Sequence, residues 1–276
     1  MDPFPHAFLL VFAQLTVGGF ASLSIPPFRV IDRGYFKSTA VVYLLIGALT
    51  FVGKVALWHR TPAPTRGTLD TLDLALWGLF LATATGYVLT LWGEAMRLRA
   101  RLFAATWSSG LLALVAAAHS YCPAASPTIE VVVYALAFVI SALLLGTVVS
   151  GMLLGHWYLI DRNLSLSPFR TMLGVYAGCL VLQALTLAFG SALLMVTGNA
   201  AIWSAYRQLW DSHLTFFAAR LLVSPLFTGL LALMIWRTLQ IPQTMAATGL
   251  FYIAILAVVV GEIMGRYLLF RTGLPL

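Results

Sequence analysis

The stretch "AVVVGEIMGRYLLFRTGLPL", residues 257–276, carries two charged side chains inside an apolar run. Glu262 and Arg266 are four residues apart, so both side chains lie on the same face of a helix. Charged groups within membrane spans usually face the bundle interior or a hydrated cavity, where they pair with one another. The stretch therefore predicts a membrane helix with its charged face turned inward.

The composition of the whole chain indicates an integral membrane protein. Of its 276 residues, 61% are hydrophobic and only 9% are charged, and the mean hydropathy is +0.94. A soluble domain has about 25% charged residues. The net charge of +7 comes from basic loops and is explained by anionic lipid, without a nucleic-acid partner. We treat residues 1–276 as a single transmembrane domain.

Eight apolar segments are long enough to span a bilayer, which takes roughly 20 residues per helix. The sequence therefore predicts an all-α bundle of about eight transmembrane helices. The stretches between them are short, and "TGNAAIWSAYRQLWD" (197–211) is one that we interpret as a loop. The predicted spans are 7–28, 39–58, 71–93, 102–121, 129–160, 171–196, 213–236 and 243–270.

The distribution of loop Lys and Arg residues predicts the orientation, because cytoplasmic loops carry the excess. Loops after the odd-numbered spans hold nine basic residues and the opposite side holds five. We therefore expect both termini on the outer, periplasmic side of a bacterial cytoplasmic membrane. The nine are Arg29, Arg33, Lys37, Arg97, Arg99, Arg101, Arg162, Arg170 and Arg237, and the five are Arg60, Arg66, Arg207, Arg266 and Arg271.

Polar residues inside the spans gather in the predicted outer half. At 1.5 Å per residue, Glu262 lies roughly 12 Å and Arg220 roughly 10 Å from the outer ends of their helices. We expect Arg220 and Lys54 to neutralise Glu262. An alternative is a buried ion pair that only fixes helix register. The predicted outer pocket comprises Gln14, Lys54, His59, Arg220, Glu262 and Arg266.

Small residues and one proline predict local packing. Gly151 and Gly155 are four residues apart, as are Gly261 and Gly265, and such pairs allow two helices to approach closely. Pro225 lies within the seventh span, where it frees a backbone carbonyl and favours a kink.

A pocket of this composition suits quinol oxidation, which releases two protons and two electrons. His59 and Glu262 are the candidate proton acceptors. The electrons need a cofactor, which a partner subunit would hold unless this chain binds haem b. The candidate haem ligands are His119, His213 and His156. His156 is also a candidate to contact a quinone head group at the inner face, although the neighbouring Trp157 and Tyr158 fit an aromatic interface belt.

Three motifs resemble the membrane anchor subunit of dimethyl sulfoxide reductase-type molybdopterin oxidoreductases. They are "FLLVFAQLTVGGFASLSI" (8–25), "KVALWHRTPAPTRG" (54–67) and "GEIMGRYLLF" (261–270). The resemblance implies an eight-helix anchor that binds menaquinol near the outer face and passes electrons to an iron–sulfur subunit. It implicates His59 and places Glu262 and Arg266 in the matching end motif.

The sequence thus favours a quinol-interacting membrane subunit of an electron-transfer complex, with iron–sulfur or cytochrome subunits as partners and with lipid and quinone as ligands. Two alternatives stay open: a b-type haem-binding subunit, and a non-catalytic subunit that retains the anchor fold in a respiratory or photosynthetic complex. A proton-coupled transporter is less favoured, because the chain lacks the repeated halves of many transporters. Whether the chain itself is catalytic is left open.

Overall fold

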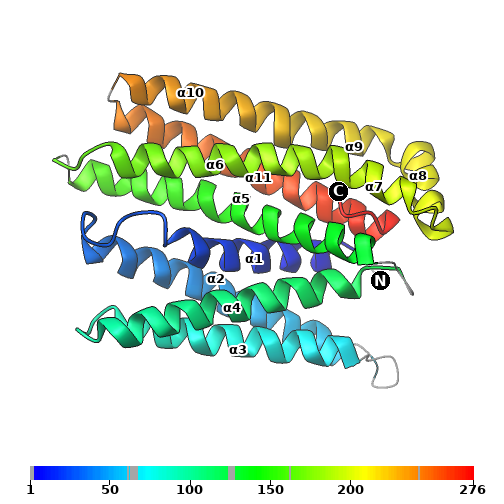
Figure 1. Ribbon diagram of the computed structural model, residues 1–276, viewed down its shortest axis with the longest axis horizontal. Helices are drawn as coiled ribbons and strands as arrows, with labels where there is room; N and C mark the ends of the chain where they lie inside the picture. The colour runs from blue at the N-terminus through cyan, green and yellow to red at the C-terminus, as the bar shows by residue number, and fades with distance from the viewer. Residues whose placement is uncertain (1–2, 61, 63–67, 124–127, 162, 242) are drawn as a thin grey trace.

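The computed structural model describes residues 3–60, 62, 68–123, 128–161, 163–241 and 243–276. Arg66 and Arg162 of the loop count, and residues 61 and 63–67 of the second motif, lie outside this part of the chain. The described residues form helices and no strand (Figure 1). The helices are α1 (Pro3–Ser22), α2 (Arg33–Arg60), α3 (Thr68–Thr90), α4 (Met96–Ser120), α5 (Thr128–Ile160), α6 (Ser167–Leu185), α7 (Ser191–Val196), α8 (Ala200–Ser212), α9 (Leu214–Leu221), α10 (Thr228–Gln240) and α11 (Thr244–Thr272), with π-helical turns η2 (Thr186–Gly190) and η3 (Leu222–Phe227).

Eight spans in the described part of the chain are long and apolar enough to cross a membrane, which indicates a multi-pass membrane protein. Six are single helices, and two, Ser167–Val196 and Leu214–Gln240, combine shorter helices with the π-helical turns. The first span ends at Ser22, whereas the sequence predicted residue 28. Pro26 and Pro27 explain the early end, because proline lacks an N–H group and disfavours helix at the residue before it.

Helices α1 and α5 form the centre of the bundle. Their apolar windows are 67% and 61% buried, against 22–39% for the other spans. Helices α2, α3 and α4 lie on one side of this pair, and α6, α10 and α11 lie on the other (Figure 1). Gly18 and Gly146 meet where α1 crosses α5, and a Cβ atom on either would overlap the backbone of the other helix. The two central helices therefore pack in direct backbone contact.

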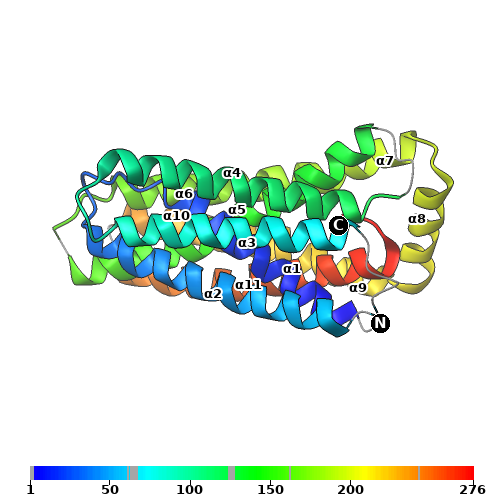
Figure 2. The same ribbon diagram turned by 90° about the horizontal axis from the view of Figure 1, so that it is seen from below.

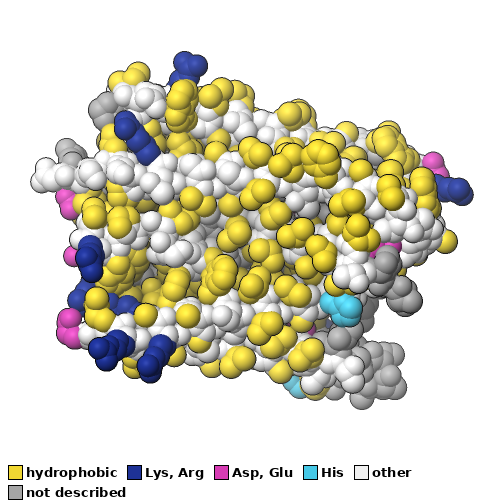
Figure 3. All heavy atoms as spheres, viewed as in Figure 1, with side chains coloured by type: hydrophobic (Ala, Val, Ile, Leu, Met, Phe, Trp, Pro, Cys, Tyr) yellow, Lys and Arg dark blue, Asp and Glu magenta, His cyan; other side chains and the backbone are white. Residues whose placement is uncertain are grey.

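The two ends of the bundle differ in charge. Both chain termini lie at one end, here called the terminal end, as Figure 1 shows. The turns at residues 23–32, 91–95 and 163–166 lie at the opposite end, where Lys and Arg side chains gather in Figure 3; we call it the basic end. Arg99 at this end is buried, and its Nη2 atom donates to the carbonyls of Thr90 and Gly93 at 3.0 and 2.7 Å. This arginine therefore holds the α3–α4 turn together.

The prediction of a loop over residues 197–211 was wrong, because Ala200–Ser212 is the helix α8. Its buried residues recur at helical spacing, so the segment is amphipathic. The side chain of Asn199 accepts a hydrogen bond from the Ala201 N–H at 3.0 Å and caps the first turn. Figure 2 shows α8 crossing the terminal end of the bundle. The buried residues are Ile202, Ala205, Tyr206 and Leu209.

The predicted glycine contacts of α5 are confirmed. A Cβ atom on Gly151 would lie 2.5 Å from the ring of Phe251, and one on Gly155 would overlap Thr248. Both partners belong to α11. The small residues therefore bring α11 against the central helix α5 and fix the position of the charged segment that follows.

Candidate functional site

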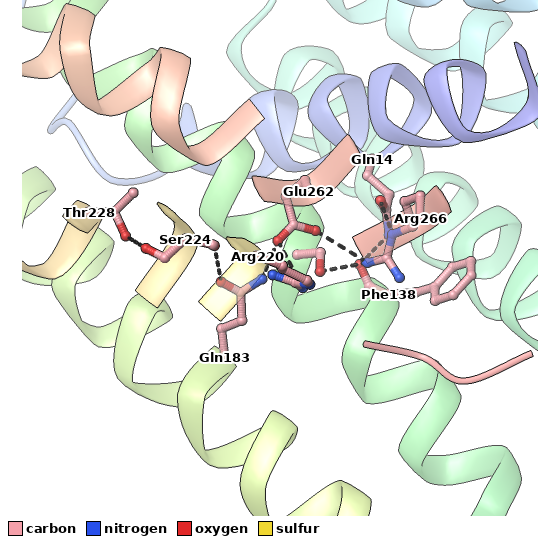
Figure 4. A network of polar contacts seen from close by, with 9 residues as sticks. Gln14, Phe138, Gln183, Arg220, Ser224, Thr228, Glu262 and Arg266 are labelled. Carbon is pink, nitrogen blue, oxygen red and sulfur yellow. Dashed lines mark hydrogen bonds and ion pairs between the residues drawn. The ribbon is translucent and has the colours of Figure 1, made fainter. Parts of the chain in front are cut away.

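Glu262 is the centre of a buried polar cluster built by residues of α1, α5, α6, α9, α11 and η3 (Figure 4). Its side chain is fully buried. The Oε2 atom accepts a hydrogen bond from Nη2 of Arg266 at 3.4 Å, one helical turn further along α11. The Oε1 atom accepts a short hydrogen bond from Nε2 of Gln183 on α6 and lies 3.6 Å from Nη2 of Arg220 on α9. One carboxylate is thus shared by two arginines and an amide.

Arg266 joins α11 to the two central helices. Its Nε atom donates to Oε1 of Gln14 on α1 at 3.0 Å, and its Nη2 atom donates to Oγ of Ser141 on α5 at 2.6 Å. The guanidinium carbon lies 4.6 Å from the centre of the Phe138 ring. Gln14 in turn donates from Nε2 to the Phe138 carbonyl at 3.2 Å. This arginine therefore fixes α1, α5 and α11 relative to one another.

The turn η3 adds Ser224 to the cluster. Pro225 lies within η3, and the wide π-helical turn accommodates its missing N–H group and its ring. Ser224 of the same turn donates to Oε1 of Gln183 at 3.4 Å. A Cβ atom on Gly261 would lie 2.5 Å from Cβ of Ser224. The absence of a side chain at Gly261 thus lets α11 approach η3 and brings Arg220 to the carboxylate.

The cluster carries more positive than negative charge. Arginine stays protonated in proteins, so two guanidinium groups surround the single carboxylate of Glu262. Among the described residues, Nε and Nη1 of Arg220 and Nη1 of Arg266 are buried without a hydrogen-bond partner. Both arginines line a cavity of about 10 Å³, together with Gln183, Ser141 and others. A volume of about 10–15 Å³ holds one water molecule.

Four of the six predicted pocket residues meet in this cluster: Gln14, Arg220, Glu262 and Arg266. The expectation that Lys54 neutralises Glu262 was wrong. Its Nζ atom lies 2.5 Å from Oδ2 of Asp73, so this pair joins α2 to α3. Arg266, in the same motif, is a partner of Glu262 that the sequence analysis did not assign.

His59 also lies outside the cluster. It is exposed in the last turn of α2, with its ring 5.1 Å from that of Trp58. Lys54 of the same motif belongs to the Asp73 pair. The second and third sequence motifs therefore do not form one site in this arrangement.

The three candidate haem ligands lie apart from the cluster. His119 and His156 are exposed, and His213 is half-buried between α8 and α9. His156 is near the basic end, where its Nδ1 atom lies 3.3 Å from the Tyr252 hydroxyl. No group of three or more His, Cys, Asp or Glu side chains suited to a metal ion occurs among the described residues. The placement of the histidines gives haem ligation no support.

Three members of the cluster were missed as site residues. Gln183 gave a signal, because an amide in the middle of an apolar span needs a buried partner. Ser141 and Ser224 gave none, since serine is common where membrane helices pack closely. Each is at most 4% exposed. Their roles become visible only when the helices are assembled.

Comparison with protein-family models, with curated proteins and with solved structures finds no match to this chain. The resemblance to reductase anchor subunits therefore rests on the three sequence motifs.

Proposed function

We propose that this chain is a quinol-interacting membrane subunit of an electron-transfer complex in a bacterial cytoplasmic membrane. The observation that carries the proposal is the buried carboxylate of Glu262, shared by two arginines that line a small cavity and keep buried N–H groups without a hydrogen-bond partner. The positive-inside rule places the basic end in the cytoplasm. The cluster then lies in the periplasmic half. The resemblance to reductase anchor subunits implies that menaquinol binds there and that an iron–sulfur or cytochrome subunit docks on this side.

The charge of the cluster suits the loss of protons from a quinol. As a quinol hydroxyl releases its proton, negative charge develops on its oxygen. The N–H groups of Arg220 and Arg266 are fixed donors in a dry environment and stabilise such charge strongly. Glu262 is the nearest group that accepts a proton. Two protons then leave toward the terminal end, and two electrons pass to the partner's cofactor.

Binding of a head group requires the cavity to widen. Its wall includes Pro275 and Leu276, in the non-helical segment 273–276 that turns back over the cluster. Gly273 ends α11 with a φ of 81°, which is readily adopted by glycine. Because this segment is outside the helical hydrogen-bond ladder, its displacement opens the cluster without unwinding a span. His59 is then a second proton acceptor only at the exposed end of the route.

A second candidate is a non-catalytic subunit whose cluster only fixes the bundle. The observation that favours it is the closure of the site, because a cavity for one water molecule admits no quinone ring. The hydrogen bonds of Arg266 to α1 and α5 serve this structural role without a ligand. The two candidates differ in what happens when the charge, but not the volume, of residue 262 is changed.

The test is quinol-dependent electron transfer in the purified complex that contains this chain. For the proposed function, Glu262→Gln in assembled complex should slow quinol oxidation by about 100-fold or more, the usual effect of a proton-transfer group. Glu94→Gln, which removes an exposed carboxylate at the basic end, is the matched control and should leave the rate unchanged. If Glu262→Gln and His59→Ala both keep the rate and the KM for quinol, the structural candidate is correct.

A further inference from the structure

A second hollow lies on the surface between α6 and α10, away from the charged cluster. It has a volume of about 530 Å³ and a mainly apolar lining. Gly174 of α6 and Gly229 of α10 form part of its walls, and a Cβ atom on either would meet nothing within 4 Å. The two glycines therefore leave an open groove where larger side chains would fill the space between the helices.

The groove has the length of one membrane leaflet. Along α6 it extends from Arg170 to Val181, eleven steps that at 1.5 Å each give roughly 16 Å. The hydrocarbon core is about 30 Å thick, so one leaflet is about 15 Å. An extended acyl chain that begins at the interface and ends near the bilayer centre matches this length.

The end of the groove at the basic end carries positive charge. Arg170 lines it and donates from Nη2 to the Leu239 carbonyl at 2.9 Å, which leaves other N–H donors of its guanidinium for a ligand. The guanidinium carbon of Arg237 lies 5.4 Å from the ring of Trp236, which also lines the groove. Both arginines are exposed. Their charge complements a phosphate at the level of the head groups.

We propose that this groove binds an anionic phospholipid, with one acyl chain between α6 and α10 and the phosphate beside Arg170 and Arg237. Apolar lining alone would accept any chain, but basic pockets between membrane helices select anionic head groups. The lipid fills the hollow left by Gly174 and Gly229 and contacts both α6 and α10 along its length. This inference is independent of the proposed quinol chemistry.

The test uses the purified chain in nanodiscs of palmitoyl-oleoyl phosphatidylglycerol and phosphatidylcholine in equal amounts, with retained lipid identified by native mass spectrometry. The wild type should retain phosphatidylglycerol in preference to phosphatidylcholine. Arg170→Gln should lower that preference about fivefold, the effect of one basic residue near the membrane surface. Arg97→Gln, an exposed arginine at the same end but outside the groove, should leave it unchanged.

Filling the groove gives an independent readout. Gly174→Leu, or Gly229→Leu from the opposite wall, should abolish lipid retention. Gly249→Leu is the matched control, because Gly249 of α11 has equally open surroundings and does not line the groove. Equal retention of both lipids by the wild type would overturn the proposal, even if a variant failed to assemble. So would undiminished retention in both groove variants, or retention of menaquinone in place of phospholipid.

Discussion

Nη2 of Arg220 lies 3.6 Å from Oε1 of Glu262, and each side chain is at most 1% exposed. Arg266 contacts the other oxygen of the same carboxylate at 3.4 Å. The cluster therefore holds one negative and two positive charges. Loss of either arginine leaves a neutral pair, whereas loss of the carboxylate leaves two uncompensated cations. The cost of each substitution follows from this difference.

The first prediction is an order of stability among charge variants. Glu262→Gln strands Arg220 and Arg266, and breaking a buried ion pair in this way costs about 3–5 kcal/mol. Arg220→Met leaves Glu262 paired with Arg266 and should cost no more than about 2 kcal/mol. Unfolding of each variant in detergent by urea measures the difference.

The double variant Glu262→Gln with Arg220→Met is the control for this order. It retains a single buried cation, so it should be more stable than Glu262→Gln alone. A double variant that is less stable than both single variants would contradict the charge argument and would assign the loss to packing.

The second prediction concerns the close approach of α11 to α9. A Cβ atom on Gly265 would lie 2.5 Å from both Nε of Arg220 and the Leu276 carbonyl oxygen. Gly265→Leu should therefore push α9 away and prevent stable folding. Gly249→Leu on the same helix meets open space and should fold as the wild type does. Size-exclusion profiles and thermal unfolding in detergent compare the two, and equal behaviour would show that the contact is dispensable.

The number of spans could be predicted from the sequence because each needs only length and apolarity. Helix α8 could not be predicted in this way, because it is short. The apolar Trp203 and Trp210 lie on its exposed side and obscure the difference between its polar and apolar faces. Its buried face is defined by contact with the bundle and not by composition. The early end of α1 was available from Pro26 and Pro27, but the apolar residues around them extended the predicted span.

The depth of the site along the helices could be predicted from the sequence, but the ion pairs within it could not. Glu262, Arg266, Arg220 and Gln14 meet because each is costly to expose to lipid, and that cost can be read from the sequence. Which cation neutralises which carboxylate depends on helix rotation. Lys54 faces α3, where it pairs with Asp73. The residue pattern of one helix does not predict which residue of a neighbouring helix lies opposite it.

The third prediction concerns orientation. Arg97 is exposed at the basic end, unlike the buried Arg99, and is the better place for a probe. In intact cells, Arg97→Cys in a Cys122→Ser background should resist an impermeant thiol reagent. His119→Cys, exposed at the terminal end, should react in the same background. Reaction at residue 97 and protection at residue 119 would invert the proposed orientation.

Cys122 is replaced in that experiment because it is a poor reporter. Burial and the nearby charge of Glu130 raise the pKa of its thiol to about 11. The thiolate is the reactive form, so little of it is present at neutral pH. The other cysteine, Cys179, is buried within α6. Labelling should therefore be slow both in the wild type and in the Cys122→Ser background, where only Cys179 is left.

The last prediction is a pH dependence of stability at the basic end. Arg33 donates from Nη1 and Nη2 to the two carboxylate oxygens of Glu94 at 2.8 and 3.1 Å, which joins the start of α2 to the α3–α4 turn. These hydrogen bonds and the charge of Arg33 lower the pKa of Glu94. Because this pKa is lower in the folded than in the unfolded protein, the pair stabilises the fold above the ordinary carboxyl pKa of about 4.3. That contribution is lost as the pH falls through the lowered value.

The wild type should therefore have a higher melting temperature than Glu94→Gln at pH 7, and this gap in melting temperature should close at acid pH. In an Arg33→Gln background, where the carboxylate has lost its partner, the same substitution should produce no such pH-dependent gap. A gap that persisted at acid pH would assign the stabilisation to the shape of the side chain and not to its charge.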